Sequence, residues 1–391
     1  MPVAGSTTAF EESAERGRTL AGQPAELNVV RDYDSFLTLR EEWEALASRL
    51  AQPSVFLRHA WADAAWAWRG QEGEPLVAVA RREGKIIGIA PLLLQKAPPG
   101  KPELSWLSVP DTQEADLICA PDDREAVAGA LADWLTTTDI RWSRLSLAPL
   151  PADSPSFPVL RAALEARGVP TMIRGAGVNG SIDLTPGWES FYRSRSRRLK
   201  KGNNLIANRL QRAGTVEVSR LTGEAITPEI QEIIRELSAE SWKQITRVTF
   251  DQPGPGAFLD TLIEHGRAGD WLVVWLLTLD GDPLASELHL EHGGRAHALR
   301  ADYTERAADL SPGSYLNWKI IERLFESGLS RYELGPGENP YKQRWTNDGL
   351  ELAAIEAWPA TSIGRLKALW HRRLRPGLAG LKSRWRRLVP G

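Results

Sequence analysis

Hydrophobic and polar positions alternate at two spacings along most of the chain. Apolar residues at helical spacing predict a helix over residues 35–50 and a second, tryptophan-rich helix over 59–68. Two apolar runs, 76–81 and 85–94, flank the turn dipeptide Glu83-Gly84 and therefore predict a β-hairpin. The same patterns predict further strands at 27–30, 104–109, 116–119 and 144–148, and helices at 124–136 and 157–167.

The second half of the chain repeats this order. Helices are expected at 228–244 and 256–266, and two more apolar runs, 271–279 and 283–290, flank the turn Asp280-Gly281. Placing one turn on the other shifts the sequence by 197 residues, which indicates a duplication. We therefore predict an α/β protein with a tandem double fold, each half being a mixed central sheet flanked by helices.

Four segments follow from this organisation. Residues 1–25 are small, polar and without periodicity, and are expected to form a disordered tail. Residues 26–175 and 176–358 are the two expected halves, joined by a glycine-rich crossover near 170–187, and 359–391 are an expected basic helical extension.

Composition narrows the class of protein. The 391 residues are 42% hydrophobic and 25% charged, with a formal net charge of −2, which fits a globular protein without a dominant polyanionic partner. The single cysteine, Cys119, cannot form an intrachain disulfide, and its apolar surroundings predict a buried side chain. Neither a secretory leader nor an apolar run of membrane-spanning length is present, so we expect a cytoplasmic protein.

A glycine-containing turn precedes a strongly amphipathic helix expected over 315–327, after two strands at 284–290 and 295–302. Such a turn leaves backbone N–H groups free to bind a phosphate or an acyl oxyanion. An ordinary serine N-cap is the alternative interpretation. The candidate residues for binding the co-substrate are Ser311, Gly313, Ser314 and Tyr315.

The next expected strand, 331–334, runs into a segment of two glycines, two prolines and several large or charged residues. Glycine permits close backbone approach, and lysine and arginine offer fixed positive charge. A turn with solvated charges is the alternative. Lys342 is a candidate catalytic residue, and Tyr341, Arg344 and Trp345 are candidates for binding substrate.

Acyl transfer to an amine or a hydroxyl needs a base for the nucleophile and a donor for the developing oxyanion. Glu287 and His289, at alternate positions on one strand, and Asp302 are the candidate bases, although a structural role for each is the alternative. No cysteine lies nearby and no helical His-x-x-x-His pair occurs, so no metal site is expected. The absence of a Gly-x-Ser-x-Gly or Walker motif disfavours hydrolases and nucleoside triphosphatases.

Two segments are strongly basic. Residues 193–212 form an expected helix with eight Arg and Lys and no acid, among them Arg197, Arg198 and Lys201. They suggest donor phosphates, tRNA or a phosphorylated acceptor as partner, or a merely solvated helix face. Residues 363–388 hold nine Arg and Lys, two tryptophans and a short apolar stripe. These features suggest peripheral contact with anionic lipid at the inner membrane face, with packing on the protein or RNA contact as alternatives.

Four motifs carry a resemblance to a known family: Ala301-Asp302-Tyr303, Ser311-Pro312-Gly313, Tyr332-Glu333-Leu334-Gly335-Pro336-Gly337-Glu338 and Tyr341-Lys342-Gln343-Arg344-Trp345. Their order resembles the GNAT-like acyltransferase family of bacterial cellulose and exopolysaccharide loci, which is similar in layout to Fem-type transferases that use aminoacyl-tRNA. One departure is Tyr332-Glu333-Leu334, where the family more often has Asp-Phe, so the role of Glu333 is open. The resemblance implies that Lys342 lies near the transfer centre and that Gly313 and Ser314 bind the donor pyrophosphate or pantetheine.

Together these features predict an acyltransferase whose second half is catalytic, with the first half as a scaffold that shapes the acceptor cleft. The expected co-substrate is a thioester, acyl-CoA or an acyl carrier protein, which is not tightly bound. The acceptor is an amine or hydroxyl of a small molecule, a glycan or a peptide. Two alternatives stay open: a Fem-type transferase that uses aminoacyl-tRNA, and a non-catalytic protein that binds an anionic ligand.

Overall fold

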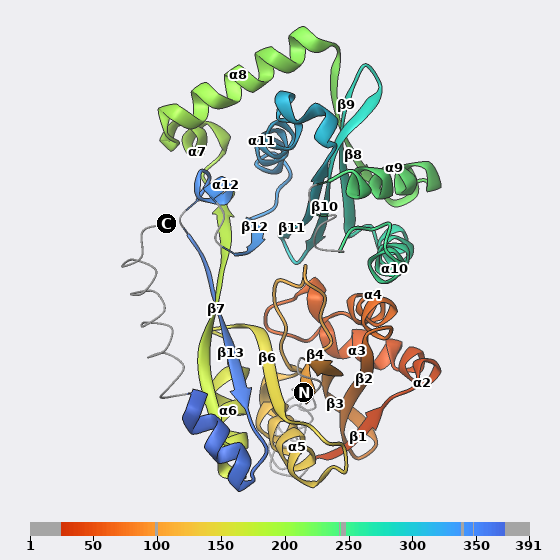
Figure 1. Ribbon diagram of the computed structural model, residues 1–391, viewed down its shortest axis with the longest axis vertical. Coiled ribbons are helices and arrows are strands. Elements are labelled where there is room, and N and C mark those ends of the chain that lie inside the picture. The colour runs from red at the N-terminus through yellow and green to blue at the C-terminus, as the bar shows by residue number, and fades with distance from the viewer. Residues whose placement is uncertain are drawn as a thin grey trace, which may run out of the picture.

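The computed structural model describes residues 25–97, 101–241, 243, 248–337, 340–346 and 348–371. The tail expected at 1–25 lies almost wholly outside these residues, as does the part of the basic extension over 372–391. The chain forms two lobes stacked along the long axis of the molecule, the first half below and most of the second half above (Figure 1).

Most predicted elements are present, with shifted ends. The first half contains β1 (Glu26–Val30), α2 (Tyr33–Thr38), α3 (Arg40–Ala47), α4 (His59–Arg69), β2 (Gly73–Arg82), β3 (Lys85–Ala97), β4 (Lys101–Trp106), β5 (Ile118–Cys119), α5 (Arg124–Thr137), β6 (Arg144–Pro151), α6 (Ser156–Ala166) and β7 (Thr171–Asp183). The second half contains α7 (Trp188–Ser194), α8 (Arg197–Ala213), β8 (Val216–Thr222), α9 (Pro228–Ala239), α10 (Pro253–Gly269), β9 (Leu272–Leu279), β10 (Asp282–His292), β11 (Arg295–Tyr303), α11 (Pro312–Leu324), β12 (Arg331–Pro336), α12 (Pro340–Gln343) and β13 (Gly349–Ala357).

Two predicted helices are interrupted. The helix expected over 35–50 divides into α2 and α3 at Leu39. The basic helix expected over 193–212 divides into α7 and α8, because Ser196 adopts an extended conformation and its side chain accepts a hydrogen bond from the Leu199 N–H. This is a serine N-cap, an arrangement preferred at the start of a helix.

The sheet repeats one strand order in both halves. Its path is β1-β2-β3-β4-β6-β13-β7-β12-β11-β10-β9-β8, with β5 added beside β3. From each end, neighbouring strands are antiparallel until β4 meets β6 and β11 meets β12, both of which are parallel pairs. The two hairpin turns also agree, since Glu83-Gly84 and Asp280-Gly281 all have positive φ, between 50° and 85°. The predicted tandem fold with mixed sheets is therefore confirmed.

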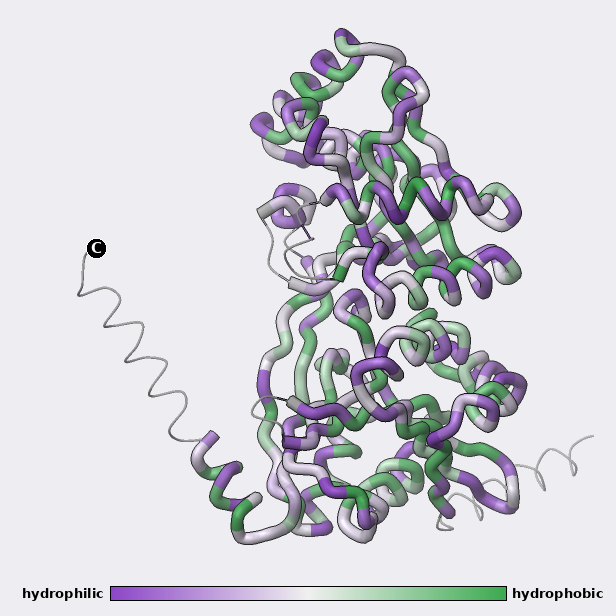
Figure 2. Tube along the Cα trace, turned by 45° about the vertical axis from the view of Figure 1, so that its right-hand side comes forward, coloured by the Kyte–Doolittle hydropathy of each residue, from purple (hydrophilic) through white to green (hydrophobic). Residues whose placement is uncertain are grey.

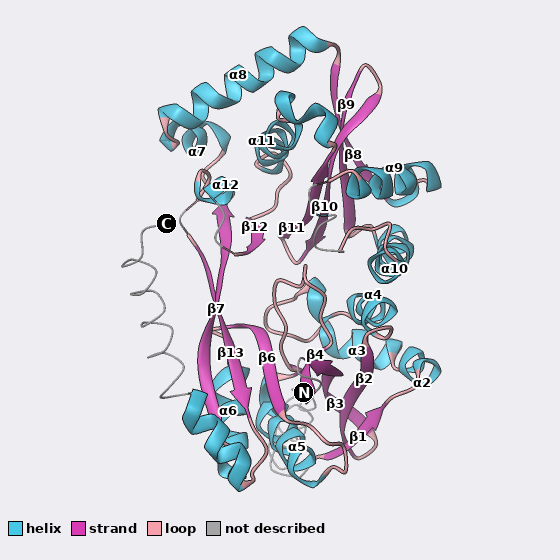
Figure 3. Ribbon diagram, viewed as in Figure 1, coloured by secondary structure: helices cyan, strands magenta, loops and turns pink. Residues whose placement is uncertain are grey.

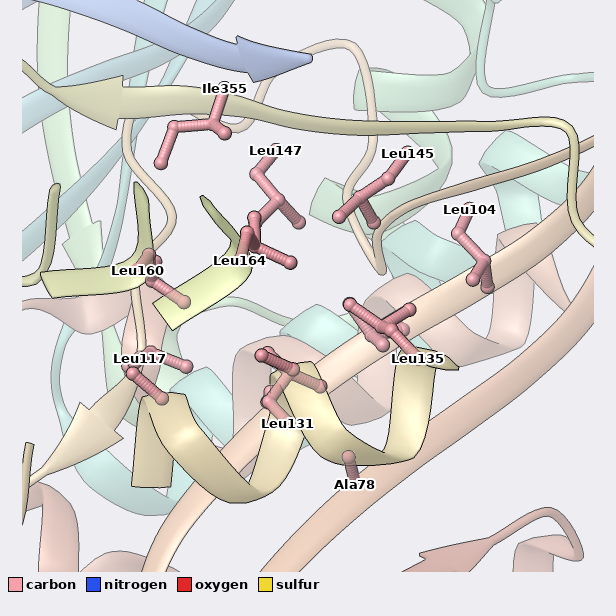
Figure 4. Close-up of a cluster of buried hydrophobic side chains, with 14 of the residues drawn as sticks. Ala78, Leu104, Leu117, Leu131, Leu135, Leu145, Leu147, Leu160, Leu164 and Ile355 are labelled. Carbon is pink, nitrogen blue, oxygen red and sulfur yellow. The ribbon is translucent and has the colours of Figure 1, made fainter. Parts of the chain in front are cut away.

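The halves exchange their last strands. β7 leaves the first half to pair with β12, while β13 returns from the second half and inserts between β6 and β7. Ile355 of β13 is fully buried in the core of the first half, together with Leu145 and Leu147 (Figure 4). The expected division at 175/176 falls within β7, which is a continuous strand.

A second connection lies on the opposite side of the molecule, where α4 packs against α10 (Figure 3). Trp61 and Phe258 meet edge to face, with ring centroids 5.4 Å apart. A Cβ atom on Gly254 would lie 2.6 Å from the Trp68 ring, so glycine is required for this approach. The lobes thus share one hydrophobic core, and the second half cannot move freely against the first.

Two further sequence expectations can be compared with the described residues. Cys119 is 1% exposed, as predicted for a core residue. No helix in the described part of the chain is both long and apolar enough to cross a bilayer.

Candidate active site

A cavity of about 450 Å³ lies in the second half where β11 and β12 diverge. The two strands pair over only three residues each, Arg295–His297 with Arg331–Glu333, and separate beyond them. In the same region β11 carries a bulge, because Leu299 is an extra residue relative to β10. The polar and charged side chains that line the cavity are Lys243, Glu287, Arg300, Tyr303, Ser311, Ser314, Asn317, Tyr341 and Lys342.

A second cavity, of about 480 Å³, adjoins the first and shares Ser314 and Tyr341 with it. Arg198 and Asn203 of α8 and its N-cap Ser196 line this cavity, together with Arg344 and Trp345. No acidic residue lines this cavity, so its polar wall is complementary to an anion.

The N-terminus of α11 stands between the two cavities. Ser311 adopts a left-handed conformation (φ 55°, ψ 48°), its side chain makes no capping hydrogen bond, and Pro312 follows as the first helical residue. The first turn contains no acidic side chain. The interpretation of Ser311 as an ordinary side-chain N-cap therefore does not describe this turn, whose N–H groups at Gly313 and Ser314 remain suited to an anion.

Glu287 is fixed by a buried network. Its Oε1 atom accepts a hydrogen bond from the Tyr332 hydroxyl (2.9 Å) and lies 3.0 Å from Nε2 of His289. The side chains of all three residues are at most 3% exposed. Burial, reinforced by the charge of Glu287, holds the pKa of the Tyr332 phenol well above its ordinary value. Tyr332 therefore stays protonated and remains a donor to the carboxylate.

Lys342 closes the other side of the cavity. Its Nζ donates hydrogen bonds to the carbonyl oxygens of Gly335 (2.8 Å) and Pro336 (3.0 Å), at the end of β12. Gly335 has φ +82°, a conformation that glycine adopts without strain. Burial lowers the pKa of the Lys342 ammonium, and the negative charge of Glu287 partly opposes that shift.

Side chains also occupy the edge of β11 at the divergence. Gln113, from the first half, donates from Nε2 to the carbonyl oxygen of Ala298 (2.7 Å), and Nζ of Lys243 donates to that of Ala301 (2.6 Å). The Gln113 Oε1 atom accepts from Asn179 (3.2 Å) and lies 3.1 Å from Nδ1 of His297. The first half thus contributes a buried residue to the base of the site.

The corresponding place in the first half holds only a small cavity, of about 110 Å³. The loop after β4 fills the divergence between β4 and β6, where the Ala115 N–H donates to the Pro149 carbonyl (2.7 Å). α5 begins beside Asp122, Asp123 and Glu125. Carboxylates at a helix N-terminus disfavour a second anion there, so the start of α11 suits an anion better than the start of α5.

The structure brings most of the predicted site residues together. Glu287, Lys342, Ser311, Gly313, Ser314 and Tyr341 line the first cavity, and Arg198, Arg344 and Trp345 line the second.

Five predicted residues lie elsewhere. His289 is completely buried behind Glu287, and Tyr315 packs in the core against Trp318. Asp302 is buried in ion pairs with Arg300 (3.1 Å) and Lys243 (3.0 Å). Arg197 and Lys201 are exposed on α8, away from both cavity walls.

Sequence reasoning missed Gln113, Lys243, Arg300, Asn317 and Tyr332. Asn317 gave a signal, because it is a polar residue at a buried position of an amphipathic helix. Gln113 gave none, since it lies outside any motif and reaches the site only through the packing of the two halves. Within the described residues, no three His, Cys, Asp or Glu side chains are arranged to hold a metal ion.

Comparison with known proteins agrees with this geometry. Residues 193–343 match a family model described as an acetyltransferase (GNAT) domain. No curated protein matches the chain in sequence. The crystal structure of FemX is similar with a TM-score of 0.55 at 11% identity, covering 87% of this chain and 100% of that one.

Two further solved structures have the same arrangement. One is the C-terminal domain of a protein assigned as a lysylphosphatidylglycerol synthetase from Agrobacterium fabrum (TM-score 0.56, 13% identity, 85% of this chain and 95% of that one). The other is L-PGS from Bacillus licheniformis (TM-score 0.52, 13% identity, 85% and 96%). At such identities the likeness establishes the fold. The match over 193–343 shows a GNAT acetyltransferase domain in the second half of the chain and supports a transferase enzyme.

Proposed function

We propose that this transferase moves an acyl group from an activated donor to an amine or hydroxyl acceptor in the cavity between β11 and β12. One observation carries the proposal: Glu287 and Lys342 line one cavity beside an uncapped helix N-terminus. This places a carboxylate, an ammonium group and free backbone N–H groups around a single space. Acyl transfer needs a base for the nucleophile and positive charge for the oxyanion.

In this proposal Glu287 accepts the proton that the acceptor loses as its nitrogen or oxygen attacks the acyl carbon. The hydrogen bonds from Tyr332 and the contact with His289 keep the carboxylate in place. Lys342 and the first N–H groups of α11 stabilise the negative charge on the acyl oxygen, and the bond to the donor then breaks. His289 and Asp302 act indirectly, because His289 lies behind Glu287 and Asp302 is engaged in ion pairs.

The favoured donor is a thioester, acyl-CoA or an acyl carrier protein. Its phosphates would lie in the second cavity against Arg198, Arg344 and the N–H of Ser314, and its acyl end would pass Tyr341 into the first cavity. Guanidinium groups suit phosphate because they offer several fixed donors. The thiolate that leaves takes up the proton that Glu287 accepted, so the donor is released as a thiol. The proposed location is the cytoplasm, where such donors are made.

A second donor, aminoacyl-tRNA, is favoured by the length of the basic surface. α8 has 17 residues, so it extends for about 25 Å, and it presents Arg197 and Lys201 outside both cavities. This surface is longer than a small donor requires. In addition, Gln113 and Lys243 already donate hydrogen bonds to two carbonyl groups of β11. The amide groups of a pantetheine arm, as in acyl-CoA, would therefore not find these two carbonyl groups free, which counts against a thioester donor.

The acceptor would be a small molecule, a glycan or a peptide with an amine or hydroxyl group. In this proposal the first half is a scaffold on the acceptor side, which fixes the cavity through Gln113 and the α4–α10 core.

The experiment compares acetyl-CoA, long-chain acyl-CoA, acyl carrier protein thioester and charged tRNA as ligands of the full chain. Release of thiol, or of deacylated tRNA, is then followed with a panel of amines and alcohols. We expect one donor class to bind and to be consumed only when an acceptor is present. Arg198→Gln with Arg344→Gln should weaken that binding. Donor binding without turnover over the whole panel would favour the non-catalytic protein, and no binding of any donor would refute the proposal.

A further inference from the structure

The helical residues 362–371 present an apolar strip to solvent. Ile363 and Leu366 are 69% and 68% exposed, and Leu369 and Trp370 are 49% and 44% exposed. The spacing of Ile363, Leu366 and Trp370 places these three on one side of a helix. These four residues are almost half of the large hydrophobic side chains that are exposed in the described chain, which otherwise comprise Tyr33, Leu37, Ile173, Val178 and Leu205.

The opposite side of this helix is anchored to the protein. Gly364 and Ala368 are buried, and the ring of His371 packs on Trp358 with centroids 5.1 Å apart. The helix lies at the periphery of the lower lobe (Figure 2), and none of its residues lines either of the two cavities. The apolar strip therefore does not arise from a loose helix end. It faces outward because the other face is packed.

Positive charge flanks the strip. Arg365 and Lys367 lie on the same helix, and the sequence continues with Arg372, Arg373 and Arg375. No Asp or Glu occurs after Glu356. A tryptophan beside aliphatic residues, in a segment whose charged residues are all basic, is an arrangement that binds the interface of an anionic bilayer.

We infer that residues 362–371 dock on an anionic lipid surface, with Ile363, Leu366 and Trp370 entering the interface and the basic residues facing the headgroups. The exposed apolar strip favours lipid over RNA, and charge favours lipid over a second copy of the chain. A second copy of this chain would bring an equally basic segment against this one, and that arrangement is repulsive. The inference does not depend on which donor the enzyme uses.

The test measures co-sedimentation of the full-length protein with vesicles of two compositions. We expect binding to vesicles of equimolar phosphatidylcholine and phosphatidylglycerol, and about tenfold or more weaker binding to phosphatidylcholine alone. Leu366→Ser with Trp370→Ser should weaken binding to the anionic vesicles by about tenfold or more, because less apolar area enters the interface. Leu37→Ser, at an exposed position of α2, is the matched control and should bind like the wild type.

Three outcomes would overturn the inference. The first is that wild-type protein does not sediment with the anionic vesicles. The second is that Arg365→Gln with Lys367→Gln lowers binding while Leu366→Ser with Trp370→Ser does not, since charge alone would then act. The third is that the serine variant changes only the self-association or thermal stability of the protein, because the strip would then be covered by another copy or by the chain's own residues.

Discussion

The side-chain amide of Gln113 donates a 2.7 Å hydrogen bond to the carbonyl oxygen of Ala298, so a residue of the first half is bound to the strand edge at the candidate active-site cavity of the second. The same amide group contacts Asn179 and His297. Burial holds the pKa of His297 well below its ordinary value, so the ring is neutral and can donate from Nδ1 to Gln113. Three buried polar groups therefore depend on one side chain.

We predict that Gln113→Leu lowers the free energy of unfolding by about 3 kcal/mol, because each buried group left without a partner costs about 1–3 kcal/mol. Urea unfolding measures this loss. Gln71→Leu is the control, since Gln71 is exposed just after α4 and its side chain donates to the nearby Ala67 carbonyl. A loss no larger than that of the control would show that Gln113 does not couple the two halves.

Lys342→Ala should lower turnover by about a hundredfold, with a smaller effect on donor affinity, since the lost charge acts mainly on the transition state. Steady-state rates and equilibrium donor binding separate the two effects. Lys85→Ala, in the exposed hairpin of the first half, should leave both unchanged. A folded Lys342→Ala variant with normal turnover would exclude a catalytic role for this residue.

The pH profile gives a separate test of the charge on Lys342. Burial lowers the pKa of this ammonium below its ordinary value of 10.5. As pH rises, Lys342 therefore loses its positive charge before an exposed lysine would. If turnover requires the Lys342 cation, the rate should begin to fall at an alkaline pH lower than 10.5. In Lys342→Arg the decline should move to higher pH, because arginine remains protonated. An identical alkaline limb in both proteins would contradict the proposed role.

Neutralising Arg197, Arg198 and Lys201 together should separate the two donor classes. Lys200 is left intact because its Nζ donates to the Arg193 carbonyl (2.9 Å) and lies over the Tyr192 ring. With a thioester donor we expect a modest loss of affinity, mainly from Arg198. With tRNA, affinity should fall steeply and the salt slope of binding should decrease by about three. Neutralising the exposed Arg40, Arg49 and Lys85 serves as control.

Glu333 should make the protein less stable as pH rises. Burial raises the pKa of its carboxyl to about 6 from an ordinary 4.5, so the folded state binds more protons than the unfolded state between these values. The free energy of unfolding then falls through this window, by up to about 2 kcal/mol. Glu333→Gln should remove that loss, and its stability relative to the wild type should rise from about pH 4.5 to about pH 6. Glu351→Gln, at an exposed position of β13, should show no such rise.

The helices, strands and hairpin turns could be predicted well from this sequence. Which strands pair with one another could not. Turn dipeptides such as Glu83-Gly84 and Asp280-Gly281 determine a hairpin within a few residues, so their prediction needs no tertiary information. The pairing of β13 with β6 joins positions about 200 residues apart, and alternation of polar and apolar residues does not say which strand lies next to which.

The same limit applies to the site. The turn at 311–314 and the segment around Lys342 were found because glycine, proline and charge cluster in sequence. Gln113 acts through contacts between distant segments and has no unusual neighbour in the chain, and the contact of Tyr332 with Glu287 likewise joins distant positions although Tyr332 lies in a motif. Asp302 had the right chemical type for a base, and only the neighbouring Arg300 and Lys243 show that its carboxylate is engaged in ion pairs.

The exchange of β7 and β13 also governs how the protein is made. When synthesis has reached residue 183, β6 is still an open strand edge, and it stays open until residues 349–357 emerge to cover it. β7 in turn must wait for β12. Neither half can therefore finish folding on the ribosome before the other exists, and an exposed edge of this kind is where a growing chain is prone to pair with a neighbour. A fragment that ends near residue 175 should be insoluble alone, and co-expression with the remainder of the chain should rescue it.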